Sequence, residues 1–158
     1  MKPNSTAELV VKQLTKLGKT VAVAESLTGG GLGSAITEVP GSSEVFLGGF
    51  VTYSEKSKTK FLEVAKRLIT KHTVVSEEVA TQMAKSAREQ FASDYAIATT
   101  GVAGPGKAYG QSAGTVWVAI ADRKNCFTIA LNISGDRATV RNSTIESALA
   151  AFSRILST

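Results

Sequence analysis

The sequence has very little of the chemistry that binds structural metals or forms disulfides. Its 158 residues include a single cysteine, Cys126, and a single histidine, His72. One cysteine cannot close an internal disulfide, and this cysteine usage fits the reducing cytoplasm, where we expect the protein to be located. Because a structural zinc site needs about four nitrogen or sulfur ligands, such a site is excluded, and we expect no metal and no cofactor.

The sequence also lacks long apolar segments and a strong surplus of one charge. No apolar run approaches the roughly 20 residues that cross a membrane, and the polar residues 1–6 do not form a signal peptide, so we expect no membrane contact. The net charge is only +5. One basic stretch supplies much of it, and such a stretch is typical of a solvated helix face. No nucleic-acid motif accompanies it, so we expect no nucleic-acid partner. Its residues are Lys56, Lys58, Lys60, Lys66, Arg67 and Lys71.

What is present predicts one globular α/β domain over residues 1–158. Hydrophobic residues make up 43% of the chain and only 3 residues are proline, a composition that supports a buried core. Ser5 with Glu8 predicts a capping box at the first helix. Strands are expected over about 20–25, 46–53, 95–100, 115–121 and 126–133, the last two as a hairpin. Together with the helical segments between them, they predict a three-layer α/β/α sandwich with a mixed, mostly parallel five-stranded sheet.

The first strand runs directly into a turn that contains Ser26, Thr28 and the glycines 29–31. Glycines that precede a helix leave backbone N–H groups able to bind an anion or an oxyanion. A serine at this turn faces those groups, which makes Ser26 the candidate nucleophile. The alternative is a tight helix entry and nothing more, because the glycines form neither a Walker A loop nor a G-x-G-x-x-G fingerprint.

A nucleophilic Ser26 needs a base, and the sequence offers no convincing Ser-His-Asp set. The lone His72 is more often a capping or packing residue. Lys58 lies one turn inside a helix that Ser54 is expected to cap, so the helix dipole and partial burial both disfavour its ammonium form. Tyr53 ends the second strand and could relay a proton or hold the serine hydroxyl. The alternatives are an ordinary surface lysine and an amphipathic tyrosine at a strand end.

Ligands of open α/β sheets bind beyond the carboxyl ends of the strands. Ser26, Tyr53 and Gly101 each follow a predicted strand, which favours one shared site. Arg137 and Arg141 lie four residues apart in the first turns of the last helix, and such a pair suits a phosphate. The alternative for the two arginines is that they cover apolar surface.

Seven segments, in order over nearly the whole chain, together resemble the CinA C-terminal domain family, the nicotinamide mononucleotide (NMN) amidohydrolases. They are AESLTGG (24–30), PGSS (40–43), GFVTYS (49–54) with Lys58, VSEEV (75–79), TGVAGPG (100–106), GTVW (114–117) and GDR (135–137) with Val140 and Arg141. The resemblance implies an α/β/α sandwich. It also implies cofactor-independent hydrolysis of the amide of NMN to nicotinate mononucleotide and ammonia, in pyridine nucleotide recycling.

The resemblance also implies a set of site residues. Matched motif by motif, the nucleophile is Ser26, the base is Lys58 and the helper is Tyr53. The implied substrate contacts are Thr28, Gly29 and Gly30 as an oxyanion pocket, Thr100 and Gly101 against the ligand, and Arg137, with Arg141 one turn on, near the phosphate. We further expect a homo-oligomer whose small-molecule partner is NMN.

Two features depart from the family pattern. Leu27 stands where the family usually has a cysteine, so no cysteine competes as nucleophile. Residues 107–113 read KAYGQSA where the family has further glycines and an acidic-Lys-Pro-Val segment. This loop favours the alternative function, a paralogue that binds a pyridine nucleotide without turnover; a serine amidase for another small amide is a third reading. Because the N-terminal domain often fused to the family is not in this sequence, we expect a stand-alone form.

Overall fold

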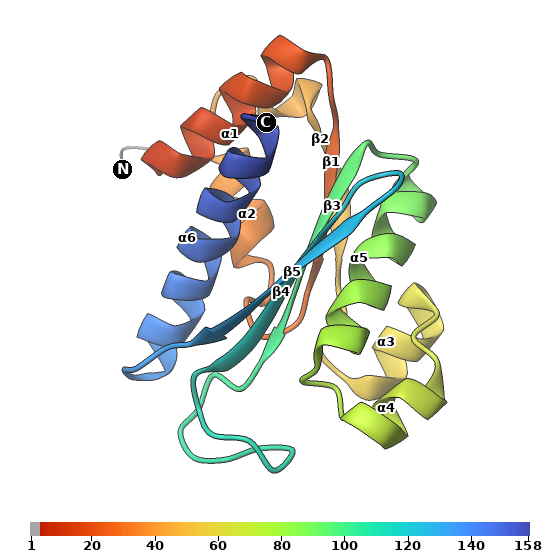
Figure 1. Cartoon of the computed structure of the whole chain (residues 1–158). Helices are drawn as coiled ribbons and strands as arrows, with labels where there is room; N and C mark the ends of the chain where they lie inside the picture. Colours follow the sequence, from red (N-terminus) through yellow and green to blue (C-terminus); the bar gives the residue numbers. More distant parts are fainter. Residues whose placement is uncertain (1–3) are drawn as a thin grey trace.

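The computed structural model describes residues 4–158, so the expectation for the first three residues of the polar start lies outside it. Helices and strands alternate along the first part of the chain, after which three successive helices, three successive strands and a last helix follow (Figure 1). The helices are α1 (Ser5–Leu17), α2 (Gly31–Thr37), α3 (Glu55–Leu62), α4 (Lys66–His72), α5 (Glu77–Phe91) and α6 (Arg137–Leu156), with a 3-10 turn, η1 (Ser42–Glu44). The strands are β1 (Val21–Glu25), β2 (Phe46–Val51), β3 (Tyr95–Gly101), β4 (Thr115–Ala121) and β5 (Cys126–Asn132). No helix within residues 4–158 is long and apolar enough to cross a membrane.

The strands form one sheet in the order β2-β1-β3-β4-β5. β1 pairs in parallel with β2 and with β3, whereas the β3–β4 and β4–β5 pairs are antiparallel. Only β4, among the strands of the described residues, therefore runs against the others. The predicted mixed, mostly parallel five-stranded sheet is confirmed. β2 ends at Val51, two residues before the predicted end.

Helices cover both faces of the sheet, which confirms the three-layer α/β/α sandwich (Figure 1). α1, α2 and α6 pack on one face, and α3, α4 and α5 pack on the other. Successive side chains of β1 point to opposite faces, so Val21 and Val23 join the first core while Ala22 and Ala24 join the second. Further alanines from β3 and β4 face α5. These small side chains let α5 pack closely against the sheet.

Side-chain caps set where two of the helices begin. Ser54 caps α3 as predicted, because its hydroxyl accepts from the Ser57 N–H and the Ser57 side chain accepts in return from the Ser54 N–H. The prediction for α1 was wrong by one residue. The side chain of Asn4 accepts two N–H groups of the first turn, and Ser5 is the first helical residue. An asparagine accepts such bonds as well as a serine does, so sequence alone did not separate the two.

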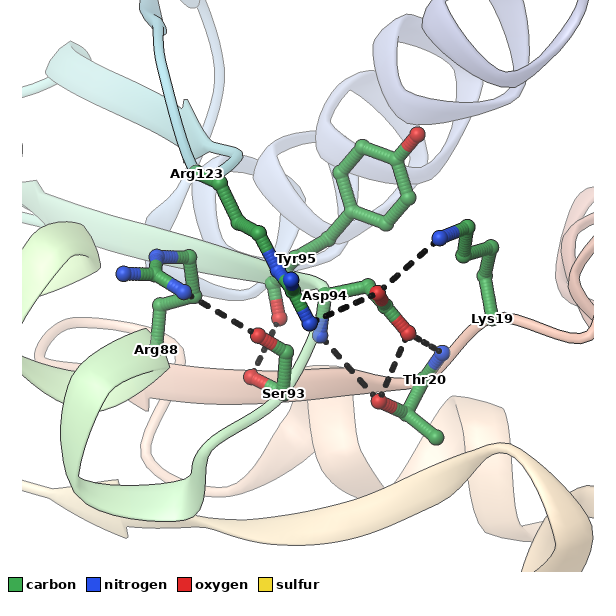
Figure 2. A network of polar contacts seen from close by, with 7 residues as sticks. All are labelled: Lys19, Thr20, Arg88, Ser93, Asp94, Tyr95 and Arg123. Atoms are coloured by element: carbon green, nitrogen blue, oxygen red, sulfur yellow. Dashed lines mark hydrogen bonds and ion pairs between the residues drawn. The ribbon is translucent and has the colours of Figure 1, made fainter.

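A polar network built on Asp94 joins the amino ends of β1 and β3 (Figure 2). The Asp94 carboxylate accepts from the Thr20 N–H at 3.0 Å and from Lys19 Nζ at 3.1 Å, and Arg123 Nη2 approaches it from the β4–β5 turn at 3.8 Å. Burial alone would raise the pKa of Asp94, but the Thr20 N–H and Lys19 hold this pKa below its ordinary value. The network ties together one end of the sheet. The carboxyl ends of β1, β2 and β3 lie at the other end, with the loop 102–114 beyond them (Figure 1).

Candidate active site

Ser26 is the first residue after β1, and the neighbouring strand fixes its backbone. Its N–H donates to the Thr99 carbonyl at 3.0 Å, and its carbonyl accepts from the Gly29 N–H at 3.0 Å. The side chain is only 7% exposed, and its hydroxyl lies 2.8 Å from Lys58 Nζ. The backbone of Ser26 is therefore fixed in a tight turn, and its hydroxyl is hydrogen-bonded to the amine of Lys58.

Lys58 is buried, with 1% of its surface exposed, although it lies in a helix rich in lysine. Its Nζ donates to Ser26 Oγ at 2.8 Å and to the Thr52 carbonyl at 2.7 Å. The Ser54 cap starts α3 so that Lys58, on its first turn, points inward towards the end of β1. This burial excludes the alternative of an ordinary surface lysine.

The surroundings of Lys58 favour its neutral form. Burial lowers the pKa of Lys58 from its ordinary value of 10.5 to about 8, and the negative charge of Glu55 offsets part of that shift. The ammonium is disfavoured because burial removes its hydration and, among residues 4–158, no carboxylate is within ion-pair distance to replace it. A lysine with a pKa near 8 is neutral often enough at physiological pH to accept a proton from a bonded hydroxyl.

Ser26 and Lys58 open onto a pocket of about 210 Å³ at the carboxyl ends of the strands. Six of the ten predicted site residues line it: Ser26, Tyr53, Lys58, Thr100, Gly101 and Arg137. Its remaining wall comes mainly from the loop after β3 and from the residues before α5: Leu27, Val74, Val75, Val102, Ala103, Gly104, Pro105, Gly106, Ala108 and Tyr109. Residues more than 100 positions apart in the sequence thus meet at one pocket, as the strand-end argument predicts.

Tyr53 and Arg137 form one side of this pocket together. The Tyr53 side chain is 59% exposed, and its hydroxyl accepts from Arg137 Nη2 at 3.0 Å. Arg137 also donates from Nη1 to the Gly104 carbonyl at 2.6 Å. The hydrogen bond of the Tyr53 hydroxyl is therefore to Arg137 rather than to Ser26 or Lys58. Arg137 links the end of β2 to the loop after β3.

Thr100 and Gly101 contribute shape more than polar groups. The Thr100 hydroxyl donates to the Val74 carbonyl at 2.7 Å, which ties the end of β3 to the segment before α5. A Cβ on Gly101 would lie 2.8 Å from the Thr115 carbonyl oxygen, so no larger residue fits there without a shift of β4. The small Gly101 lets the pocket wall lie close to the sheet.

The other four predicted site residues, Thr28, Gly29, Gly30 and Arg141, do not line the pocket. The Thr28 hydroxyl is buried and hydrogen-bonded to Thr99 Oγ1 at 2.8 Å, and the Gly29 N–H donates to the Ser26 carbonyl. The Gly29 N–H is thus already bonded within the turn and does not point to an oxyanion, which removes one of the three residues expected to form the oxyanion pocket.

Arg141 and Glu25 hold the turn that follows β1. Arg141 donates from Nε to the Leu27 carbonyl at 3.0 Å and from Nη2 to the Thr28 carbonyl at 3.2 Å. The buried Glu25 carboxylate accepts from the N–H groups of residues 32 and 33, at 2.8 and 3.0 Å. The start of α2 is therefore occupied by a carboxylate of the protein itself, so it does not supply the anion site expected from the glycines.

Leu27 is a residue that the sequence reasoning missed. It lines the pocket directly after Ser26, and within residues 4–158 its N–H has no protein acceptor. The N–H of the residue after a nucleophile is a common oxyanion donor. The position of Leu27 directly after the candidate nucleophile already indicated this role. The glycines instead led to the prediction of an oxyanion pocket at Thr28, Gly29 and Gly30.

His72 lies outside the pocket, at the end of α4, where its Nδ1 is 3.4 Å from a Glu78 carboxylate oxygen. In the part of the chain that the structure describes, no three His, Cys, Asp or Glu side chains gather in a group that could hold a metal ion. The polar side chains that line the pocket are two hydroxyls, an amine, two phenols and a guanidinium.

A buried serine–lysine pair at the strand ends of an α/β/α sandwich defines a class of α/β protein, and comparison with known proteins gives its family. The family model of the CinA C-terminal domain matches residues 3–156. A CinA-like protein of Geobacter sp. (strain M21) is 47% identical over 137 residues, which cover 86% of this chain and 33% of that protein. The chain belongs to the CinA C-terminal domain family.

Solved structures of the family have the same fold. A competence-damaged protein (CinA) superfamily protein from Klebsiella pneumoniae 700603 matches with a TM-score of 0.96 and 30% identity, over 99% of both chains. The competence/damage inducible protein CihA from Agrobacterium tumefaciens matches with a TM-score of 0.92 and 34% identity, over 100% of this chain and 99% of that one. By contrast, the chain spans about a third of the length of the curated relatives it matches.

Proposed function

We propose that this chain is an amidohydrolase that converts NMN and water to nicotinate mononucleotide and ammonia, with Ser26 as the nucleophile and Lys58 as the base. The observation that supports it most directly is the 2.8 Å contact between Ser26 Oγ and Lys58 Nζ at the wall of a pocket. The choice of NMN rests on the resemblance to the NMN amidohydrolases. A small cleft next to a nucleophile suits a carboxamide, whose reacting group is compact.

In this mechanism neutral Lys58 takes the proton of Ser26 while Oγ attacks the amide carbon. The carbonyl oxygen becomes an oxyanion, which the N–H of Leu27 stabilises. Collapse of the tetrahedral intermediate breaks the carbon–nitrogen bond, and the Lys58 ammonium returns the proton so that ammonia leaves. Water, with Lys58 again as base, then hydrolyses the ester on Ser26 and regenerates the hydroxyl. Atoms and charge balance without any further group.

The remaining pocket residues bind the rest of the nucleotide. A cavity of about 210 Å³ is smaller than the roughly 300 Å³ of the smallest typical ligand pockets, so it takes the reacting end of the substrate. Arg137 lies at one side of the pocket, exposed, with a guanidinium suited to a phosphate. Binding of the phosphate there would compete with the Tyr53 hydroxyl and release it into the pocket.

The second candidate function is a module that binds a pyridine nucleotide without turnover. The observation that favours it is the loop 107–113, which departs from the family pattern and supplies Ala108 and Tyr109 to the pocket wall. A changed wall can hold the ligand with its amide away from Ser26. Both candidates predict binding of NMN, and only the first predicts ammonia.

The test is incubation of the purified chain with NMN, with ammonia measured by a coupled assay and the nucleotide product identified by chromatography. We expect ammonia and nicotinate mononucleotide in equal amounts. Binding of NMN by calorimetry without ammonia would establish the binding module instead. If the chain neither binds NMN nor releases ammonia, both candidates are contradicted.

A further inference from the structure

The loop after β3 contains a two-residue hairpin turn whose conformation is unusual for its sequence. Ala108 and Gln111 exchange both backbone hydrogen bonds, at 3.0 and 2.9 Å. The two residues between them, Tyr109 and Gly110, have φ angles of +53° and +72°. Positive φ at both central positions is what a type I′ turn requires.

Tyr109 is a poor choice for that turn on conformational grounds. The first central position of a type I′ turn favours asparagine or glycine, and a bulky aromatic residue at positive φ is an outlier. Gly110 satisfies the second position at no steric cost. A strained residue that persists beside a ligand pocket points to a use for its side chain.

The turn is fixed against the rest of the pocket. The Gln111 side chain donates to the Val75 carbonyl at 2.7 Å and to Thr73 Oγ1 at 3.3 Å. Val75 itself lines the pocket, so the loop is anchored to the pocket wall. Tyr109 is therefore presented by a hydrogen-bonded turn and not by an untethered loop.

Tyr109 lines the pocket and is nevertheless 52% exposed, as Tyr53 is 59% exposed. A side chain that is both on the pocket wall and half in solvent lies where the pocket opens. Two aromatic side chains thus lie at the opening, beyond Ser26 and Lys58. Aromatic faces at that position bind planar rings, and they attract a cationic ring more strongly than a neutral one.

We propose that Tyr109 is a specificity-determining residue that packs its ring on the planar, cationic pyridinium ring of the substrate. This proposal rests on the proposed function for the identity of the ring. Tyr109 belongs to residues 107–113, the segment that departs from the family pattern. Its role is binding, and the chemistry remains with Ser26 and Lys58.

The experiment measures affinity for two probes by calorimetry, in a Ser26→Ala background that does not consume substrate. NMN carries the pyridinium ring, and ribose 5-phosphate lacks it. Tyr109→Asn removes the ring and suits the turn, whereas Tyr109→Phe keeps the ring. Ala92→Asn is the matched control, because Ala92 also has positive φ, at +50°, but caps α5 away from the pocket.

We expect Tyr109→Asn to weaken NMN binding roughly 5- to 30-fold and to change ribose 5-phosphate binding less than about 2-fold. Tyr109→Phe should stay within about 3-fold of the parent for both probes. Tyr109→Asn and Ala92→Asn should both raise the melting temperature, since asparagine tolerates positive φ better than tyrosine or alanine. In the active chain, Tyr109→Asn should raise KM and leave kcat unchanged.

Two results would overturn the assignment of Tyr109: unchanged NMN affinity in Tyr109→Asn, or an equal loss for both probes. An equal loss for both probes together with a lower melting temperature of Tyr109→Asn would show that Tyr109 only supports the loop. If NMN binds but releases no ammonia, amidohydrolysis fails while the binding arms still decide the role of Tyr109. If the parent binds no NMN at all, both proposals fail.

Discussion

The pKa of Lys58 makes a prediction about folding stability that does not depend on knowing the substrate. In the unfolded chain the lysine titrates near 10.5, and in the folded chain near 8. Below about pH 8 the folded state must therefore carry a buried ammonium that water would otherwise solvate. At roughly 1.4 kcal/mol per pH unit, this burial costs about 3 kcal/mol of unfolding free energy at neutral pH.

The sign follows from proton binding. Between about pH 8 and 10.5 the unfolded state binds more protons at this site than the folded state, so the free energy of unfolding rises with pH. The destabilisation is complete below the folded pKa and is lost as the pH passes the unfolded pKa. Between about pH 7 and 9.5 the wild type should gain about 2 kcal/mol relative to a variant without the amine.

Urea unfolding of the wild type and of Lys58→Met, at several pH values over that interval, measures this gain. Methionine matches the length of the lysine stem, and every other titrating group is common to both chains and cancels in the difference. The lost hydrogen bonds to Ser26 and Thr52 shift the whole curve but not its slope. Parallel curves for the two chains would refute a lowered pKa, and with it the role of Lys58 as a base.

Three further predictions follow from single contacts. Glu55→Gln removes the charge that raises the pKa of Lys58, so the ascending limb of the pH–rate profile should move to lower pH; an unmoved limb would exclude this coupling. The wild type should prefer NMN over nicotinamide riboside by roughly 30–150-fold in affinity, as expected from one charge-assisted contact to the phosphate, and Arg137→Ala should erase most of that preference. Titration of both ligands against both proteins measures it. Equal binding of the two ligands by the wild type would exclude Arg137 from phosphate recognition. Asp94→Asn should lower the urea midpoint at neutral pH, and its difference from the wild type should shrink as the pH falls below about 3.8. The reason is that Asp94, whose pKa is lowered in the fold, stabilises the fold only while its carboxylate is ionised. A difference in midpoint that does not depend on pH would contradict this reasoning.

The sequence predicted the fold well because its local signals agree with one another. The strands are short and apolar, Ser54 caps α3, and the glycine turn follows β1 at the predicted place. The convergence of strand ends also predicted which loops meet, and six of the predicted site residues line one pocket. These features depend on spacing along the chain, which a sequence displays directly.

The direction of a side chain, and which group of the protein bonds a given backbone N–H, could not be predicted from spacing along the chain. A lysine-rich helix does not reveal that Lys58 alone points inward. The glycine turn does not reveal that Glu25 occupies the start of α2 or that Arg141 holds the carbonyls after Ser26. Each of these contacts joins residues whose relative placement depends on the packed sheet.

The most direct test of the Ser26–Lys58 pair is the rate of ammonia release from NMN by four chains: the wild type, Ser26→Ala, Lys58→Arg and the control Ser34→Ala. Ser34 is an exposed serine of α2 close to the same turn, so its loss should leave the rate unchanged. Loss of the nucleophile, or replacement of the base by a permanently charged group, should lower the rate at least about 10³-fold in chains that remain folded. Ammonia release at the wild-type rate from folded Ser26→Ala or Lys58→Arg would contradict the proposed mechanism.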